Sequence, residues 1–538
     1  MNRALGPDPP AAGRAWSTVR AMFGVAVGAL LALYVGFFVV KCVQDIRCPY
    51  TLDYGEGLVL SQVLRLAHGQ ELYNDYTHYP FVFSNYPPLF HAVAAIGARH
   101  FGASFGFGRA LAFGAMLGTA GMMVLLLRRC GVGLAPALGA PAFLLSTYHV
   151  VMWSGFMRVD SLALLLSMGG LYCVLRGGKW LIPGVVLMVA AIYTKQSMVA
   201  GLAASVVYLW WIGERRNAVL FLAGWAGAVL VIFAVFEITT HGWFYRHMVT
   251  ANAHPWFADQ TWRYVKDALL PWPVLFIVAG ISAAVLVRRE RGQPNRDQAA
   301  HAGRGERLLV PYLGVAAVLS LTVGKAGASV NYMIELLAAT CMVASLGYQR
   351  LTSAAPSRGA QALWGLMAVA LLAQVIHMWR LPSTWDWYRN ACASGGRAAA
   401  RIIAQTKGDI IGDPPGVAVL SGRPLLLDPA TASCMALGGK FDLTPVLRDI
   451  RRRRFSLIYM SAQVRWAQPQ HDLYSARWSV PMMEAILRHY RDAGSVGDLC
   501  FLVPRQSLAD RPRINRRGAR LKGEPAAVGR KVPLRPRD

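Results

Sequence analysis

Charged and polar side chains in this chain gather at the ends of long apolar segments. Asp53 and Glu56 follow the first such segment. A carboxylate held there could act as a general base and accept a proton from a hydroxyl group. The spacing also predicts a capping box, in which Asp53 caps a helix and Glu56 bonds back to the cap. The two interpretations are compatible, because a capping carboxylate is already held in place.

Two further clusters have the same placement. Arg158 and Asp160 stand before another apolar segment, either as an N-cap with an interfacial arginine or as a second carboxylate near Asp53 that holds a metal ion or a hydroxyl group. Lys195 and Gln196 follow the next segment. A lysine there either extends its side chain to lipid headgroups or binds a lipid phosphate.

A fourth cluster contains Lys325, Asn331, Tyr332 and Glu335. We place Glu335 about one turn inside an apolar segment, where an ionisable side chain is costly and therefore indicates a function. The segment 240–264 adds His254 to several tryptophans, which we interpret as an interfacial aromatic belt.

The composition predicts a membrane protein. Of the 538 residues, 55% are hydrophobic and 15% are charged, whereas soluble proteins carry about 25% charged residues. This excludes a water-soluble fold, and it excludes disorder for most of the chain. Apolar stretches of membrane-spanning length predict about eleven transmembrane helices, at about 20–41, 106–127, 131–151, 160–175, 179–194, 197–213, 218–239, 270–287, 308–323, 333–349 and 361–380.

The basic residues predict the orientation. Arginines and lysines recur in alternate loops, from Arg128 and Arg129 to Arg350 and Arg358. We therefore expect the chain in the inner or plasma membrane of the cell. The positive-inside rule places its N-terminus and these loops in the cytoplasm. The net charge of +27 is therefore explained without nucleic acid.

Three regions then lie outside the cytoplasm: 42–105, 240–269 and everything after 381. We expect three parts of the chain. Residues 1–380 form the membrane part, with an interfacial helix at 89–101 in the outer loop 42–105. Residues 381–504 form a small extracytoplasmic α/β domain, with strands at 416–427 and 455–460 and helices at 441–454 and 479–493. Residues 505–538 form a basic tail that we expect to be disordered.

The eight cysteines form no CxxC motif, which argues against a zinc ribbon or a redox site. In the predicted orientation, Cys392, Cys434 and Cys500 face an oxidising compartment and allow three pairings. Cys42 and Cys48 are a second candidate pair.

The motifs resemble those of the GT-C membrane glycosyltransferases, in particular the protein O-mannosyltransferases and the aminoarabinose transferase of lipid A. The resemblance covers about residues 20–350. It consists of an acidic motif after the first span, a GxxLYxD motif, a PPL motif, an arginine opening the next span, an RxD motif and a TKQ motif. In this chain these are Asp53 with Glu56; Gly69, Leu72, Tyr73 and Asp75; Pro87, Pro88 and Leu89; Arg109; Arg158 with Asp160; and Thr194, Lys195 and Gln196.

The resemblance implies transfer of a sugar from a polyprenyl-phosphate donor to an acceptor outside the cytoplasm. The acceptor is an envelope glycan, a lipid or a protein. Nucleotide sugars are absent there, and the chain has no GxGxxG or GxxxxGK[ST] motif before a cytoplasmic helix, so we expect no nucleotide cofactor. Some members carry an acid and a lysine just before PPL, where this chain has Asn85 and Tyr86.

The chemistry assigns roles to the clusters. We expect Asp53 to be the base, with Glu56 and Asp160 in the catalytic group. We expect Lys195 first, then Arg158, with Gln196, to bind the departing phosphate. A divalent metal ion between Asp53 and Asp160 is a further hypothesis. Direct attack with one base implies inversion at the anomeric carbon. The sugar or acceptor is expected to contact a set of residues comprising Tyr86, Lys325, Asn331, Tyr332 and Glu335.

Two other functions stay open. A flippase for lipid-linked glycans would share the basic loops, but it requires a polar path with helices broken at the midplane. A non-catalytic membrane scaffold for envelope-glycan assembly is the third hypothesis.

Overall fold

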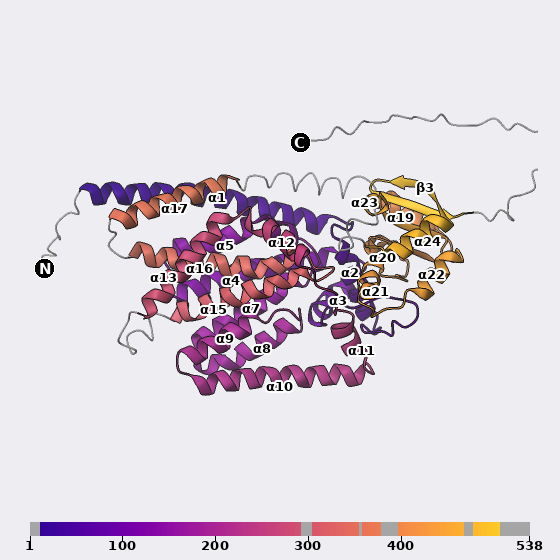
Figure 1. Ribbon diagram of the computed structural model, residues 1–538, viewed down its shortest axis with the longest axis horizontal. Helices are drawn as coiled ribbons and strands as arrows, with labels where there is room; N and C mark the ends of the chain where they lie inside the picture. The colour runs from indigo at the N-terminus through magenta and orange to yellow at the C-terminus, as the bar shows by residue number, and fades with distance from the viewer. Residues whose placement is uncertain (1–10, 292–303, 354–357, 378–395, 467–476, 506–538) are drawn as a thin grey trace, which may run out of the picture.

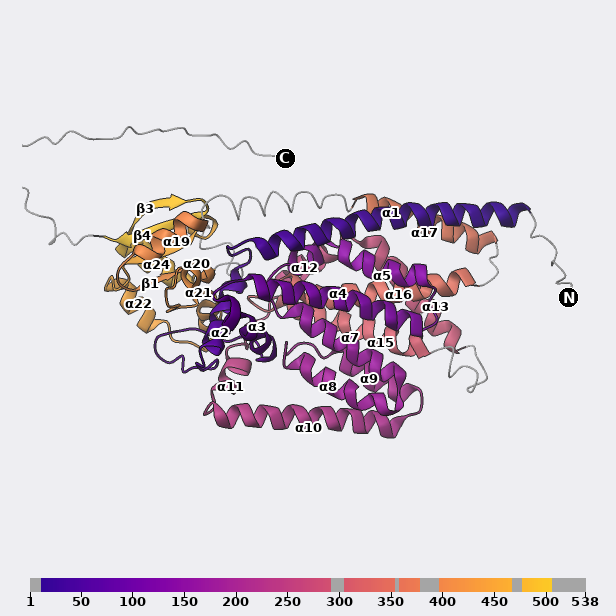
Figure 2. The same cartoon turned by 180° about the vertical axis from the view of Figure 1, so that it is seen from behind.

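The structure is a computed structural model that describes residues 11–291, 304–353, 358–377, 396–466 and 477–505. Long helices lie side by side in an elongated bundle, and α1 (Ala11–Arg47) runs along most of its length (Figure 1). A small sheet with its own helices occupies the end of the molecule opposite the start of α1, as the view from behind also shows (Figure 2). The candidate residues lie between these two parts.

Each of the eleven predicted spans coincides with one or two helices. The first falls on α1. The others fall on α4 (Gly106–Arg129), α5 (Leu134–Ser146) with α6 (Tyr148–Trp153), α7 (Asp160–Arg176), α8 (Leu181–Ile192), α9 (Ala200–Trp211), α10 (Arg215–Thr239), α13 (Pro273–Arg291), α15 (Arg304–Ser320), α16 (Ile334–Ser353) and α17 (Arg358–His377). The sequence pattern therefore located the helices of the bundle correctly.

Five helices are long and apolar enough to cross a membrane by themselves, within the ranges that the structure describes. They are Ala21–Arg47, Gly106–Arg129, Arg215–Thr239, Gly305–Gly324 and Val330–Arg350. A sixth span would need α12 (Ala258–Leu269) and α13 together, and these are bent by 91°. Helices such as α8 and α9 have 12 residues, or about 18 Å at 1.5 Å per residue, which is short of a membrane core of about 30 Å. The protein has the helices of a multi-pass membrane protein, and the count of eleven spans stays a prediction.

Three of the predicted cytoplasmic loops meet at one end of the bundle. Arg350 donates to Glu306 over 2.7 Å and to the carbonyl of Cys130 over 3.3 Å, and Gln349 Oε1 accepts from the Gly133 amide. These contacts tie together the loops after α4, before α15 and after α16. The orientation of the whole bundle stays a prediction.

Two short helices and a long loop follow α1. The first is α2 (Tyr54–Ala67), and the second is α3 (Leu89–Phe101), which has the bounds expected for the interfacial helix. The loop between them packs its aromatic rings Tyr76, Phe81 and Phe83 into the core of the C-terminal part. Phe81 also pairs with that part through its backbone, since its amide donates to the carbonyl of Leu426 over 2.8 Å.

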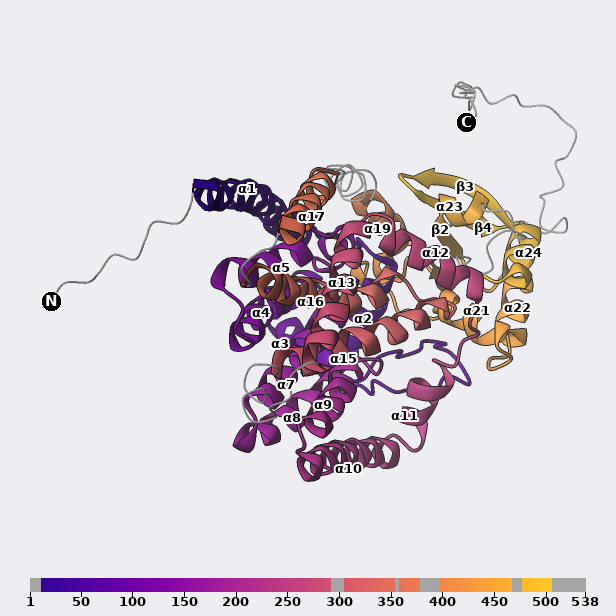
Figure 3. The same ribbon diagram turned by 60° about the vertical axis from the view of Figure 1, so that its left-hand side comes forward.

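The C-terminal part contains a four-stranded sheet in the order β1-β2-β4-β3. Its strands are β1 (Ile410–Gly412), β2 (Leu457–Ser461), β3 (Tyr490–Val496) and β4 (Leu499–Pro504), and only β1 and β2 are parallel. Both faces of β2 are buried, as in sheets covered on two sides. The helices around it are α19 (Gly396–Gln405), α20 (Pro415–Leu420), α21 (Pro429–Leu437), α22 (Thr444–Arg451), α23 (Ala462–Trp466) and α24 (Val480–His489) (Figure 3).

Side chains alternate across β2 because successive residues of a strand point to opposite faces. Ile458 and Met460 pack with α22 and α24, whereas Leu457 and Tyr459 pack with α19 and α20. The predicted α/β composition and the strand at 455–460 are therefore present. The boundaries of a domain at 381–504 stay a prediction, and the tail 506–538 lies outside the described residues.

The predicted strand at 416–427 is wrong. Residues 415–420 form helix α20, with Pro415 in its first turn, where proline is favoured. The helix ends before Gly422, whose φ of +68° suits glycine. A short apolar run does not distinguish a buried strand from a buried helix. The flanking proline and glycine were the informative signal.

The predicted cysteine pairs are also wrong. Cys48 is disulfide-bonded, whereas Cys42, Cys434 and Cys500 are free. Each pairing expected among Cys392, Cys434 and Cys500 needs at least one of the two free thiols. Cys392 itself lies outside the described residues.

Candidate functional site

The first turn of α2 holds Asp53 in place. Asp53 is the N-cap, its Oδ2 accepts from the Gly55 amide over 2.9 Å, and Glu56 completes the predicted capping box. The Asp53 side chain is 20% exposed and lines a cavity, so the carboxylate remains accessible, as a base requires.

Glu56 has a different environment. Its side chain is fully buried and forms a two-pronged ion pair with Arg109 of α4, at 2.7 Å for Oε1 and 2.8 Å for Oε2. The amides of Leu52 and Met157 donate to the same carboxylate. Burial alone would raise the pKa of Glu56, but Arg109 and these amides outweigh it and hold the pKa below its usual value. Both oxygens of Glu56 are therefore occupied by contacts that join α2 to α4.

Arg109 shows why this pair is structural. Its remaining N–H groups donate to the carbonyls of Asp45, Cys48 and Tyr50, so the guanidinium ties the end of α1 and the following loop to α4. Sequence analysis named Arg109 only as a family motif. Its partner Glu56 is 53 residues away along the chain, and no local pattern predicts such a pair.

Arg158 faces Asp53 instead. Its Nε lies 3.3 Å from Asp53 Oδ2 as an ion pair without the geometry of a hydrogen bond, and the two side chains are 15% and 20% exposed. The guanidinium also lies over the Trp153 ring, at 5.1 Å. A Cβ at Gly55 would overlap the Arg158 guanidinium, so glycine is required for this close approach. The pair is partly open, in contrast to the sealed Glu56–Arg109 pair.

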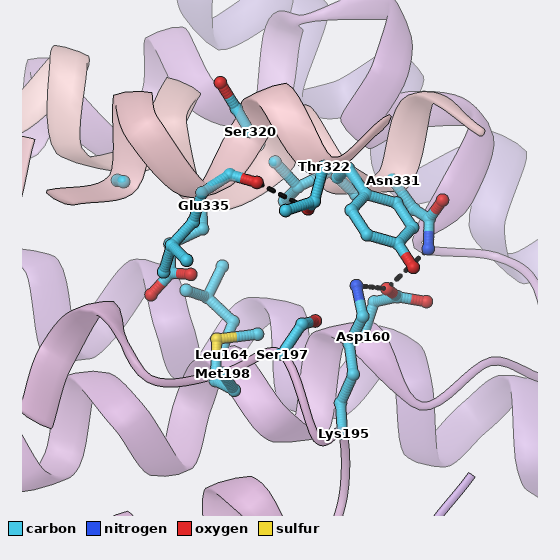
Figure 4. Close-up of a pocket in the computed structure, with 13 residues that line it drawn as sticks. Asp160, Leu164, Lys195, Ser197, Met198, Ser320, Thr322, Asn331 and Glu335 are labelled. Atoms are coloured by element: carbon cyan, nitrogen blue, oxygen red, sulfur yellow. Dashed lines mark hydrogen bonds and ion pairs between the residues drawn. The ribbon is translucent and has the colours of Figure 1, made fainter. Parts of the chain in front are cut away.

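Asp160 stands at the start of α7, two residues after Arg158. Its Oδ1 accepts from Lys195 Nζ over 2.6 Å and from Asn331 Nδ2 over 2.8 Å, and its Oδ2 accepts from Trp153 Nε1 over 2.8 Å. Figure 4 shows Lys195 and Asn331 converging on this carboxylate. Three predicted site residues from distant parts of the sequence are therefore in direct contact.

Lys195 is held as a cation in this cluster. Its Nζ lies 4.6 Å from the centre of the Tyr332 ring. Burial alone would lower the pKa of the ammonium, but the adjacent Asp160 carboxylate outweighs it and raises the pKa. Tyr86 lines the same cavity as Arg158.

A cavity of about 910 Å³ touches Asp53 on the side of Arg397 and Arg401. Two other cavities are each lined by both members of one ion pair. The smaller has a volume of about 30 Å³ and is lined by Asp160, Lys195, Asn331, Tyr332 and Glu335 among others. This is about the volume of a single water molecule. Glu335 lies away from the ion pair in Figure 4 and accepts from Tyr312 Oη over 3.1 Å.

The larger cavity of these two has a volume of about 260 Å³ and lies beside Asp53. Asp53 and Arg158 line it, together with Tyr86. Its wall also contains residues that sequence analysis did not select, namely Gln62, Asn85, Trp153, His254, Thr431, Cys434 and Arg477. The cavity therefore lies between α2, the loop after it and the C-terminal part.

The C-terminal part reaches the site through Tyr54, the neighbour of Asp53. Tyr54 Oη donates to Asp428 Oδ1 over 2.7 Å, and the Arg477 guanidinium lies over the Tyr54 ring at 4.6 Å. Arg477 in turn donates to Asp413 Oδ1 over 3.0 Å. Desolvation raises the pKa of Asp413 to about 6, although Arg477 opposes the shift. This network fixes the wall of the cavity opposite the bundle.

The backbone of α2 also touches the C-terminal part. A Cβ added at Gly57 would overlap the backbone of Gly416, at the start of α20. Glycine at both positions allows the two chain segments to lie directly against each other.

Two predicted site residues lie apart from the ion pairs. Gln196 Nε2 donates to the Asn85 carbonyl over 2.9 Å, which joins the lysine loop to the outer loop. Lys325 lines neither cavity. Burial lowers the pKa of its ammonium to about 8, with Lys195 as a further unfavourable charge.

The predicted metal site does not fit these side chains. Asp53 faces Arg158, and Asp160 already accepts three hydrogen bonds, from Lys195, Asn331 and Trp153. No group of three or more His, Cys, Asp or Glu side chains suited to a metal ion occurs in the described ranges. Hard divalent cations need several oxygen ligands, and here both carboxylates are engaged by cations of the protein.

The architecture is similar to that of solved membrane enzymes. ArnT from Cupriavidus metallidurans bound to undecaprenyl phosphate has 14% sequence identity and a TM-score of 0.56, over 88% of this chain and 97% of that one. The apo state of ArnT has 12% identity and a TM-score of 0.58, over 89% of this chain and 98% of that one.

The oligosaccharyltransferase of Archaeoglobus fulgidus, in complex with zinc and sulfate, has 10% identity and a TM-score of 0.50, over 87% of this chain and 72% of that one. No protein-family model matches the sequence, and no curated protein sequence is similar to it. At these identities the likeness is one of fold. The chain has the fold of the GT-C membrane glycosyltransferases, the family that its motifs resemble.

Proposed function

We propose that the protein is a glycosyltransferase that moves a sugar from a polyprenyl-phosphate donor to a hydroxyl group of an acceptor outside the cytoplasm, with inversion at the anomeric carbon. The observation that carries the proposal is the Asp53–Arg158 pair, which lines a 260 Å³ cavity where the helix bundle meets the C-terminal part. The GT-C fold and the undecaprenyl phosphate bound to ArnT support the choice of donor.

Asp53 is the base in this proposal. The acceptor hydroxyl attacks the anomeric carbon and gives its proton to Asp53, so that a new carbon–oxygen bond forms as the bond to the phosphate breaks. The N-cap contact to Gly55 keeps the carboxylate in position during this step. Glu56 is left out of the reacting groups because both its oxygens bond Arg109 and backbone amides.

The departing phosphate carries negative charge that needs a cation. Arg158 is the first candidate, because it lines the cavity with Asp53 and its Nε has no hydrogen bond among the described residues. A donor phosphate that binds Arg158 would also release Asp53 from its ion pair and leave that carboxylate free to accept a proton. Lys195 ranks second, because Asp160 holds it in the smaller cavity.

Turnover of a labelled donor tests the proposal. Purified full-length protein in detergent or nanodiscs is mixed with undecaprenyl phosphate carrying a radiolabelled sugar, and free sugar and glycosylated products are measured. We expect release of undecaprenyl phosphate above the rate without protein, and an inverted anomeric configuration in any product. Binding of donor without any sugar release or transfer, across glucose, mannose, galactose and arabinose donors, would contradict it and favour a carrier.

A further inference from the structure

Three polar side chains on the wall of the larger cavity have no use in the scheme above. They are Gln62 on α2, Asn85 in the loop before α3, and His254 between α10 and α12. Each carries a buried atom without a hydrogen-bond partner among the described residues: Gln62 Oε1, Asn85 Oδ1 and His254 Nε2. Leaving such an atom unpaired is unfavourable, so three on one wall indicate a missing partner.

The free atom of Gln62 is a hydrogen-bond acceptor. The side chain is 2% exposed, and its Nε2 donates to the carbonyl of Phe83 over 2.9 Å. A carbonyl only accepts, so this contact fixes which end of the amide faces Phe83. The carbonyl oxygen Oε1 is therefore the unpaired end.

The same argument applies to His254. Its Nδ1 lies 2.8 Å from the carbonyl of Ala326, and this nitrogen must therefore carry the proton. Burial, with Lys325 nearby, lowers the pKa of the ring, although the backbone carbonyls of Ala326 and Ala251 oppose this shift, so the imidazole is neutral near pH 7. Nε2 then presents a lone pair and no hydrogen.

Asn85 completes the set. Its Nδ2 donates to Thr431 Oγ1 over 3.1 Å, which leaves Oδ1 without a partner. Acceptors thus come from α2, from the outer loop and from the loop before α12. A ligand that satisfies them must bring several O–H or N–H donors in different directions, which the hydroxyl groups of a sugar do.

Four aromatic rings form a further part of the wall. Tyr54, Phe83, Tyr86 and Trp153 line the same cavity. Small-molecule sites are largely apolar with a few placed polar groups and measure about 300–1,000 Å³. A cavity of about 260 Å³ is near the lower limit and suits one ring-sized group. Aromatic faces pack against the C–H faces of a pyranose, while its hydroxyl groups donate at the edge.

We propose that this cavity binds one neutral glycosyl unit, whose hydroxyl groups donate to Gln62 Oε1, Asn85 Oδ1 and His254 Nε2. The proposal rests on sugar transfer at Asp53 and names the chemical class of the group bound beside it. Two sources share this chemistry, the sugar of the donor and a sugar of the acceptor.

Direct binding tests the site without turnover. Saturation-transfer NMR on the full-length protein in detergent micelles uses neutral methyl glycosides as probes: gluco-, manno-, galacto- and xylopyranoside and arabinofuranoside. We expect at least one neutral glycoside to bind. Failure of all neutral glycosides to bind would overturn the proposal.

Variants locate the binding. His254→Asn keeps a donor for the Ala326 carbonyl but lacks an atom at the Nε2 position, and Gln62→Leu removes the acceptor. Each should weaken glycoside binding about tenfold or more, and His254→Gln should restore part of it. Unchanged binding in both His254→Asn and Gln62→Leu would place the sugar elsewhere and reject the site.

His91 supplies a matched control. It is buried, its Nδ1 lies 3.2 Å from the Pro87 carbonyl, and its Nε2 is also unpaired among the described residues, but it does not line the cavity. His91→Asn should leave glycoside binding unchanged. An equal loss in this variant would mean that substitution of any buried histidine damages the fold, and the effect at His254 would then not support the site.

Competition separates the two sources. Undecaprenyl phosphate carrying the glycosyl unit that bound is added to the bound methyl glycoside. Displacement by this donor, but not by undecaprenyl phosphate alone, assigns the cavity to the donor sugar; simultaneous binding assigns it to the acceptor. The test is independent of the proposed function, because glycoside binding that depends on Gln62 can persist even if Asp53 proves dispensable for turnover.

Discussion

Asp53 and Glu56 lie three residues apart at one helix N-terminus, and each is paired with an arginine. The Glu56–Arg109 pair is fully buried, and its hydrogen bonds use both carboxylate oxygens. The Asp53–Arg158 pair is partly exposed, has no hydrogen bond between its partners and lines a cavity. Charge and position in the sequence do not separate the structural acid from the candidate reacting acid. The difference is whether the protein's own hydrogen bonds already occupy both carboxylate oxygens.

Removing Arg109 from the buried Glu56–Arg109 pair should have the largest effect on stability. Arg109→Met leaves Glu56 buried without a counter-charge and removes three bonds to backbone carbonyls. Loss of one partner of a buried pair costs about 3–5 kcal/mol, so we expect little folded protein. Yield and thermal unfolding in detergent measure the loss. Arg99→Met, on the exposed side of α3, is the control, and a stable Arg109→Met protein would contradict the structural role.

Changing Asp53, the partly exposed acid, should lower activity without affecting folding. Asp53→Asn removes the base but keeps a good N-cap, because asparagine caps helices as well as aspartate does. We expect the transfer rate to fall about 10²- to 10⁴-fold with an unchanged unfolding temperature. Asp442→Asn, at an exposed turn, serves as control. If Asp53→Asn keeps the wild-type rate, Asp53 is not the base.

The two cations extend the comparison. Arg158→Met should lower kcat about 10²- to 10³-fold, by analogy with the loss of one group that stabilises developing charge, and should affect stability little. Lys195→Met should instead destabilise the protein, because the buried Asp160 carboxylate would lose its ion pair with Lys195. The double variant with Asp160→Asn should recover part of that stability. The opposite pattern in unfolding and rate measurements would make Lys195 the phosphate-binding cation.

Substitution of Lys325 should have the smallest effect, a change in how stability depends on pH. Its pKa of about 8 lies below the ordinary lysine value, so the unfolded chain holds this proton more tightly than the folded protein does. Stability should therefore rise with pH between about 8 and 10, and the full penalty is present at pH 7. Lys325→Met should remove this slope and stabilise the protein at pH 7. An unchanged slope in unfolding measurements would show that Lys325 is not the group responsible.

The sequence predicted the bundle because hydropathy and basic loops are strong local signals. It also predicted the capping box, since Asp53 and Glu56 are neighbours in one helical turn. Asp160 and Lys195 were both predicted as site residues from their placement at helix ends, whereas their direct contact with each other is a finding of the structure. Their roles in catalysis stay a prediction.

The other contacts of the candidate site depend on long-range packing, which the sequence did not predict. No spacing rule joins Glu56 to Arg109, or Tyr54 to Asp428 across 374 residues. Gln62 offered a signal that was not used: it stands on the apolar face of α2, where a polar side chain needs a partner. His254 was interpreted as part of an aromatic belt because its loop is rich in tryptophan. Its place in the cavity wall follows from the fold alone.

The direct backbone contact between Gly57 and Gly416 limits which C-terminal parts can be combined with this bundle. With no side chain to act as a spacer, α2 and the C-terminal part fit only as a matched pair, and even alanine at Gly57 would push them apart. Grafting the C-terminal part of another protein onto this bundle would therefore have to preserve glycine at both positions. An exchange that ignores them would separate α2 from α20 beside the cavity.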